Sequence, residues 1–115
     1  MTDTTADILR KAKAHISDPA MWNQDGGFFR SSGGKSFTDY DEDFEFITCP
    51  ACAFGAIQFA SMTDDYPRVD RIMENACYEI VGTRDVVFYN DCPTTTHADI
   101  MALFDRAIQL AEAEQ

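Results

Sequence analysis

Apolar residues recur at intervals of three and four positions in three separate segments of the chain. This spacing predicts amphipathic helices that each bury one face. The segments are the region after Thr4, residues 67–81 and residues 97–113. The predicted buried positions are Ile8, Leu9, Ala12 and Ile16, then Val69, Ile72, Met73, Ala76, Cys77 and Ile80, then Ile100, Leu103, Phe104, Ala107, Ile108 and Ala111.

Short polar signals mark where these helices begin and end. Thr4 or Thr5 can cap the first helix, with Asp7 placed three residues after Thr4 as in a capping box. Thr96 and Asp99 repeat this spacing before the last helix. Gly82 is a natural stop for the helix over 67–81.

A fourth helix is predicted in an almost wholly apolar stretch from Ala51 to Ala60. Thr48 or Cys49 can cap it, and Pro50 falls in its first turn, where proline is well tolerated. Because such a helix has no polar face, it is expected to lie at the centre of the domain.

Two segments are predicted to be extended. Residues 43–48 alternate apolar and acidic side chains, and residues 85–89, "DVVFY", are rich in β-branched and aromatic residues. Residues 19–42 carry two Gly-Gly pairs and predict an irregular loop or hairpin. The predicted architecture over residues 1–115 is therefore one compact α+β domain, mainly α, with four helices and two or more short strands.

Charge is the one extreme feature of the composition. Twenty acidic residues against nine basic ones give a formal net charge of −11, which argues against direct binding to nucleic acid. No Lys or Arg occurs between Lys35 and Arg68. The seven acids in that span are Asp39, Asp41, Glu42, Asp43, Glu45, Asp64 and Asp65.

No segment predicts a signal peptide or a membrane span, because the N-terminal stretch is amphipathic and no apolar run approaches about 20 residues. The expected location is the cytoplasm. Its four cysteines are accordingly expected to be reduced thiols.

The turn before the last helix gathers polar residues that allow two interpretations. In the structural one, Asn90 and Asp91 are turn residues and His97 is an exposed first-turn residue. In the catalytic one, Asp91 acts as a base and His97 as an acid or base at the end of a strand, with Asn90 orienting them and Cys52 nearby.

The "CPAC" motif at residues 49–52 suggests two further chemistries. Cys49 and Cys52 at the start of a helix could form a redox pair with a lowered thiol pKa. Alternatively, Cys49 and Cys52 could join Cys77 and Cys92 as zinc ligands. A second Cys-x-x-Cys pair is missing, and Cys77 lies on an apolar stripe, so neither metal nor cofactor is expected.

Three motifs together carry a family resemblance. They are Trp22-Asn23-Gln24, then Cys52-Ala53-Phe54-Gly55-Ala56, then Asn90-Asp91 followed by Thr96-His97. In this order they resemble a family of short bacterial and phage proteins catalogued as a domain of unknown function. The resemblance implies a shared framework for Trp22, Cys52, Gly55, Asn90, Asp91 and Thr96, but it implies no activity. Ala51 and Tyr89 stand where the family tends to have an aromatic residue and a Trp.

The favoured hypothesis is a non-catalytic, acidic interaction protein of phage type that binds a basic protein, such as a nucleic-acid-binding host protein, as an inhibitor or DNA mimic would. The seven acids of residues 36–67 are the predicted binding residues. The alternatives are a small enzyme at the Asn90-Asp91 turn, a redox or zinc site at the cysteines, and a homodimer formed through the Ile100 to Ala111 stripe.

Overall fold

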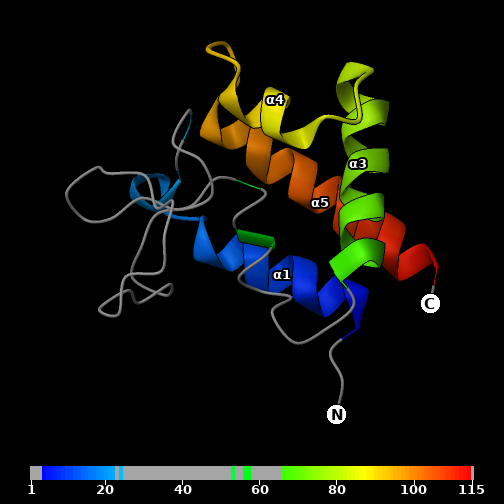
Figure 1. The fold of residues 1–115 in the computed structure, drawn as a ribbon. Helices are drawn as coiled ribbons and strands as arrows, with labels where there is room; N and C mark the ends of the chain where they lie inside the picture. Colours follow the sequence, from blue (N-terminus) through cyan, green and yellow to red (C-terminus); the bar gives the residue numbers. More distant parts are fainter. Residues whose placement is uncertain (1–3, 23, 25–52, 54–55, 58–65, 115) are drawn as a thin grey trace.

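The computed structural model describes residues 4–22, 24, 53, 56–57 and 66–114, and most of these residues are helical. In chain order the elements are α1 (Thr5–His15), the 3-10 helix η1 (Pro19–Met21), α3 (Tyr66–Val81), α4 (Val86–Asp91) and α5 (His97–Ala113) (Figure 1). Ala53, Ala56 and Ile57 are helical and fully buried. Their burial agrees with the apolar central helix predicted for that stretch.

The predicted α+β class is wrong, because the described residues form helices and no strand. The predicted strand over 85–89 is instead the start of α4. The Asp85 side chain accepts a hydrogen bond of 2.9 Å from the Phe88 backbone N–H and so caps this helix. Capping and core packing therefore override the β propensity of the Val-Val-Phe-Tyr run. The strand predicted at 43–48 and the hairpin beyond residue 24 lie outside the described residues.

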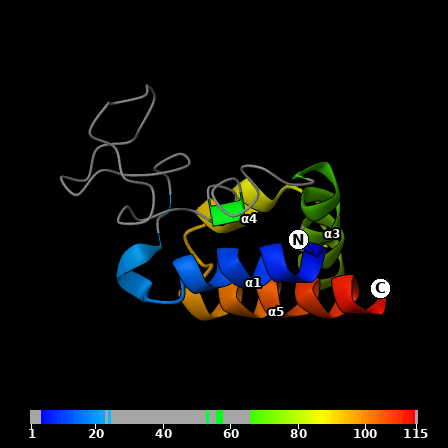
Figure 2. The same cartoon turned by 90° about the horizontal axis from the view of Figure 1, so that it is seen from below.

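Helices α1 and α5 lie side by side and run in opposite directions (Figure 2). Two ion pairs between exposed side chains fix the direction. Arg10 Nη2 lies 3.2 Å from Glu112 Oε1, and Lys13 Nζ lies 2.6 Å from Asp105 Oδ1. As the residue number rises along α1, the partner on α5 moves toward the start of that helix, so the pair is antiparallel.

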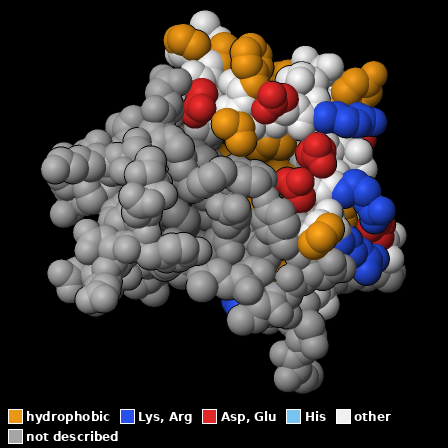
Figure 3. All heavy atoms as spheres, viewed as in Figure 1, with side chains coloured by type: hydrophobic (Ala, Val, Ile, Leu, Met, Phe, Trp, Pro, Cys, Tyr) orange, Lys and Arg blue, Asp and Glu red, His pale blue; other side chains and the backbone are white. Residues whose placement is uncertain are grey.

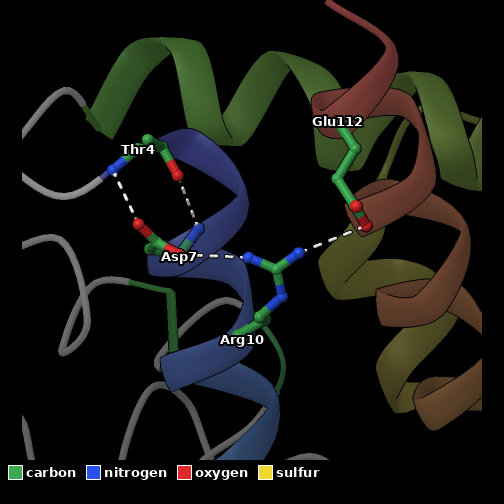
Figure 4. Close-up of polar contacts among 4 residues, drawn as sticks. All are labelled: Thr4, Asp7, Arg10 and Glu112. Carbon is green, nitrogen blue, oxygen red and sulfur yellow. Dashed lines mark hydrogen bonds and ion pairs between the residues drawn. The ribbon is translucent and has the colours of Figure 1, made fainter. Parts of the chain in front are cut away.

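Both predicted capping boxes form. The Thr4 hydroxyl accepts from the Asp7 backbone N–H at 3.1 Å, and the Asp7 carboxylate accepts from the Thr4 N–H at 3.3 Å (Figure 4). Figure 4 also shows Arg10 joining this cap to Glu112 of α5. Thr96 and Asp99 make the equivalent pair of bonds at the start of α5, at 2.9 and 3.1 Å. The carboxylates thus satisfy backbone donors that a helix start leaves without partners.

Helix α3 crosses α5 at the end of the α1–α5 pair, as Figure 1 shows. Arg106 of α5 binds Glu79 of α3 through Nε at 2.6 Å and Nη2 at 3.3 Å. The helix ends as predicted at Gly82, whose φ of 81° lies in the left-handed region, and its N–H donates to Tyr78 O at 2.9 Å.

One core joins the apolar stripes of these helices. All four positions predicted for the first helix are buried, including Ile16 just beyond the end of α1. Five of the six on α3 are buried as well, and the sixth, Ile80, is 43% exposed near the helix end. On α5 the stripe is buried except for Ile108, which packs partly against the core. The α5 stripe therefore packs inside this chain. None of the helices in the described part is long and apolar enough to cross a membrane.

Candidate functional site

The predicted site region is a helix–turn–helix corner rather than the end of a strand. Helix α4 ends at Asp91, and a turn closed by a 3.0 Å bond from Thr95 N to Cys92 O leads to the Thr96 cap of α5. Asp91 therefore lies at a helix C-terminus. The carbonyl groups there create a negative potential, whereas a strand end beside helix N–H groups would favour an anion.

Asn90 lies at the centre of this corner and is completely buried. Its side-chain oxygen accepts two hydrogen bonds, from the indole Nε1 of Trp22 at 2.8 Å and from the backbone N of Ala53 at 3.0 Å. Its amide nitrogen donates to Asp91 Oδ1 at 3.0 Å. One side chain thus links the segment after η1, the buried helical segment at Ala53 and α4.

Gln24 holds the other side of the corner. Its side-chain nitrogen donates toward three backbone carbonyl groups, those of Asn90 at 3.0 Å, Cys92 at 2.9 Å and Thr95 at 3.1 Å. These carbonyls belong to the end of α4 and the turn that follows it, where a helix leaves acceptors without partners. Gln24 therefore fixes the path of the chain between α4 and α5.

His97 completes the cluster. Its Nε2 lies 2.7 Å from the backbone oxygen of Ile16, just beyond α1, which ties the start of α5 to the end of α1. The Trp22 and His97 rings lie 5.8 Å apart between centroids and are tilted by 59°. We call Trp22, Gln24, Ala53, Asn90 and His97 the Asn90 junction.

The structure brings three of the four candidate catalytic residues to this corner. Asn90 is inside the junction, Asp91 accepts its amide bond, and His97 bonds to Ile16 O. The fourth candidate, Cys52, lies outside the described residues. The polar atoms of the junction thus bond to backbone groups and to each other, which is how buried polar residues stabilise a fold.

The two described cysteines have different surroundings, and neither forms a disulfide. Burial raises the pKa of the Cys77 thiol to about 11, so this thiol is protonated at neutral pH. The hydrogen bond with the Thr94 hydroxyl, at 3.4 Å, lowers the pKa of Cys92. Within the described ranges no group of three or more His, Cys, Asp or Glu is placed to hold a metal ion. Cys49 and Cys52 lie outside those ranges.

The seven acids predicted to bind a partner also lie outside the described residues. A different acidic surface is described between α3 and α4. Its hollow has a volume of about 330 Å³ and is lined by Asp70, Glu74, Arg84, Asp85, Val86 and Val87. Burial raises the pKa of Asp70, and burial followed by the charge of Asp70 raises that of Glu74. Among the described residues, no Lys or Arg forms an ion pair with these two carboxyl groups.

Large apolar side chains are exposed on the end of α3 and on α4, and one of them, Val87, lines this hollow. In the described part they are Tyr78, Ile80 and Val81 at the end of α3, and Val87 and Phe88 on α4. Phe88 is 66% exposed. Figure 3 shows hydrophobic and acidic side chains next to each other over α4 and the adjoining part of α3. We call Asp70, Glu74, Asp85, Val87 and Phe88 the α3–α4 face.

The sequence pattern does not predict this face, because it predicts a strand over residues 85–89, where α4 forms. A helical reading of residues 85–91 was available from Asp85, a good N-cap, and from the spacing of Val86 and Asn90. It would have placed Val86 and Asn90 inward and Val87 and Phe88 outward. In the sequence Gln24 belongs to the Trp22-Asn23-Gln24 motif, and nothing local marks it as a partner of three carbonyls more than 60 residues away.

Comparisons with known proteins identify a family but no relative of known activity. A model described as a family of unknown function, DUF6197, matches residues 1–110. Neither the curated proteins nor the solved structures include a significant match. The match spans nearly the whole chain, including the Asn90 junction. The chain therefore belongs to this family of unknown function.

Proposed function

We propose that this chain is a non-catalytic interaction protein whose acidic surface binds a basic protein. The observation that carries the proposal is the formal net charge of −11, with seven acids and no base between residues 36 and 67. A surface of one sign attracts a partner of the opposite sign over a distance of about 10 Å at moderate salt, and so accelerates association. A nucleic-acid-binding protein has such a basic surface. If the gene is carried by a phage, the partner is a host protein in the cytoplasm.

The polar corner supports a structural rather than a catalytic role for its residues. An enzyme at this corner would need Asp91 and His97 to face a substrate together. Here His97 Nε2 lies 2.7 Å from the carbonyl oxygen of Ile16. The Asp91 carboxylate accepts a hydrogen bond from the side-chain amide of the buried Asn90. Both side chains thus have partners that belong to the fold.

The test begins with capture of host proteins on the tagged chain at low salt, followed by affinity measurements with the purified partner. A variant that combines Asp39→Asn, Asp41→Asn, Glu42→Gln and Asp43→Asn is expected to bind about tenfold more weakly, because it removes opposite charges from the interface. The loss is expected to shrink as salt is raised, since salt screens charges on the surface.

A matched control separates a local acidic surface from net charge alone. Glu79→Gln, Asp105→Asn, Glu112→Gln and Glu114→Gln neutralise four acids on α3, α5 and the C-terminal end, and change the formal charge by the same amount. The control is expected to keep most of the affinity. Equal affinity of both variants and the wild type at low salt, or a captured partner without a basic surface, would contradict the proposal.

A further inference from the structure

The α3–α4 face combines features that single exposed residues do not share. Its apolar members Val87 and Phe88 are 37% and 66% exposed. Val87 lines the hollow together with three carboxylates, and Phe88 is the next residue of α4. Isolated surface hydrophobic residues are ordinary, but a group of them bordered by charge is typical of a protein-binding surface. In the described part of the chain, every large exposed hydrophobic side chain lies between residues 78 and 88.

Helix α4 exposes these residues because its other side is fixed. Val86 is only 4% exposed, Asn90 is fully buried, and Tyr89 packs partly against the core. The short helix therefore cannot rotate to bury Phe88 without breaking the bonds from Asn90 to Trp22 and Ala53. The junction thus holds the apolar face of α4 toward solvent.

The charge of the hollow selects the kind of occupant. Among the described residues, Asp70, Glu74 and Asp85 line it together with one cation, Arg84. The Arg84 guanidinium carbon lies 4.4 Å from the centre of the Tyr78 ring, so this cation is stacked on an aromatic face. In the described part of the lining, three carboxylates therefore face one cation. Burial raises the pKa of Asp70 and Glu74, and a bound cation would lower both pKa values again.

We propose that the α3–α4 face binds an amphipathic helical segment of the basic partner, with an apolar side chain against Phe88 and a Lys or Arg side chain in the hollow. The hollow of about 330 Å³ holds roughly the volume of ten water molecules. That space suits one long side chain rather than a folded domain. A second copy of this chain would bring the same negative charge to the face, which opposes self-association.

This inference rests on the proposed function, since it names the structure by which the same basic partner is held. Its test uses a defined probe, a labelled helical peptide of Leu and Lys about 14 residues long, or roughly four helical turns. Binding is measured by fluorescence anisotropy and located by backbone amide chemical shifts. Shifts are expected to concentrate between residues 70 and 91. A peptide with Ser in place of Leu and the same charge is expected to bind at least fivefold more weakly.

Variants then test each part of the face. Phe88→Ala is expected to weaken binding of the Leu–Lys peptide about fivefold and to leave binding of the Ser–Lys peptide unchanged. The double variant Asp70→Asn with Glu74→Gln is expected to weaken binding of the Leu–Lys peptide about tenfold. The control pair Glu79→Gln with Glu114→Gln makes the same charge change outside this face and is expected to alter the affinity less than twofold. Circular dichroism confirms that each variant is folded.

Three results would overturn the inference. They are shifts spread over all acidic surfaces, equal effects of the two double variants, and a dimer in sedimentation experiments that Phe88→Ala dissociates. The proposed function is tested separately, because its variant changes residues 39–43 and its partner comes from the host. Peptide binding at the face can therefore fail while a captured basic protein still depends on the acidic span, and the reverse outcome is equally distinguishable.

Discussion

The Asn90 junction and the α3–α4 face both bring polar side chains from several elements together, but these side chains differ in burial and in their bonding partners. In the junction, Asn90 is fully buried and its oxygen accepts bonds of 2.8 and 3.0 Å from Trp22 and Ala53. On the face, Asp70 and Glu74 are partly buried, and within the described residues no cation forms an ion pair with either. The two regions are linked through α4, which contributes Asn90 to one and Phe88 to the other.

This contrast separates residues that stabilise the fold from residues available for recognition. A buried polar group with its partners in place contributes to stability and is costly to remove. A carboxyl group that is partly desolvated without a cation slightly opposes folding, as the raised pKa of Asp70 indicates. Substitutions in the two regions should therefore change stability by different amounts and in opposite directions.

The largest effect is expected from Asn90→Ala. This change leaves the Trp22 indole N–H and the Ala53 backbone N–H without their acceptor. Each buried donor without a partner costs about 1–3 kcal/mol, so we expect the free energy of unfolding to fall by about 3 kcal/mol in urea denaturation. Asn75→Ala, at an exposed position of α3, is the control and should change it by less than about 0.5 kcal/mol. Similar results for the two variants would mean that the junction does not stabilise the fold.

A smaller loss of stability is expected from Gln24→Glu, which keeps the size of the side chain. The substitution places a carboxylate against the three carbonyl oxygens of Asn90, Cys92 and Thr95, where an amide donor is required. We expect a loss of about 2 kcal/mol at neutral pH. Because this environment raises the pKa of the new carboxyl group in the folded state, the loss is present above that pKa and shrinks as the pH falls.

Gln109→Glu is the matched control for this prediction. Gln109 is exposed on α5, and its side-chain oxygen accepts a 3.1 Å bond from Arg106. A carboxylate is well suited to that donor, so stability should be unchanged or slightly higher at neutral pH. If the two Gln→Glu variants lost the same free energy, the bonds of Gln24 would have no special role.

Periodicity predicted the long helices well because each repeats one local rule along its length. The Thr4–Asp7 and Thr96–Asp99 boxes and the Gly82 stop lie within a few residues of the helix ends they set. The buried stripe of α3 was predicted correctly up to Cys77. Ile80 has the same spacing but extends beyond the packed part of the helix, and periodicity alone does not show where packing ends.

Helix α4 and the contacts of the junction could not be predicted in the same way. Six residues provide less than two helical turns, so the β propensity of Val86, Val87 and Phe88 competes with a weak helical pattern. The bond between Trp22 and Asn90 joins residues 68 positions apart. The motifs indicated that these residues share a framework, but only the assembled helices show that Asn90 lies at its centre.

The smallest effect, and the one of opposite sign, is expected from Asp70→Asn on the α3–α4 face. Burial raises the pKa of Asp70, so its ionised form opposes folding above that pKa, and the cost disappears as the pH falls and the group is protonated. Solvent screens much of this effect at a partly exposed group, so we expect a gain of a few tenths of a kcal/mol at neutral pH and none in acid. Glu79→Gln is the matched comparison, because its bond to Arg106 lowers the pKa of Glu79, and its removal should reduce stability at neutral pH. Urea denaturation of both variants should be compared at neutral pH and in acid. At neutral pH, the two changes in the free energy of unfolding should have opposite signs. A loss of stability for Asp70→Asn would show that its carboxylate stabilises the fold, and the contrast between the two regions would then be wrong.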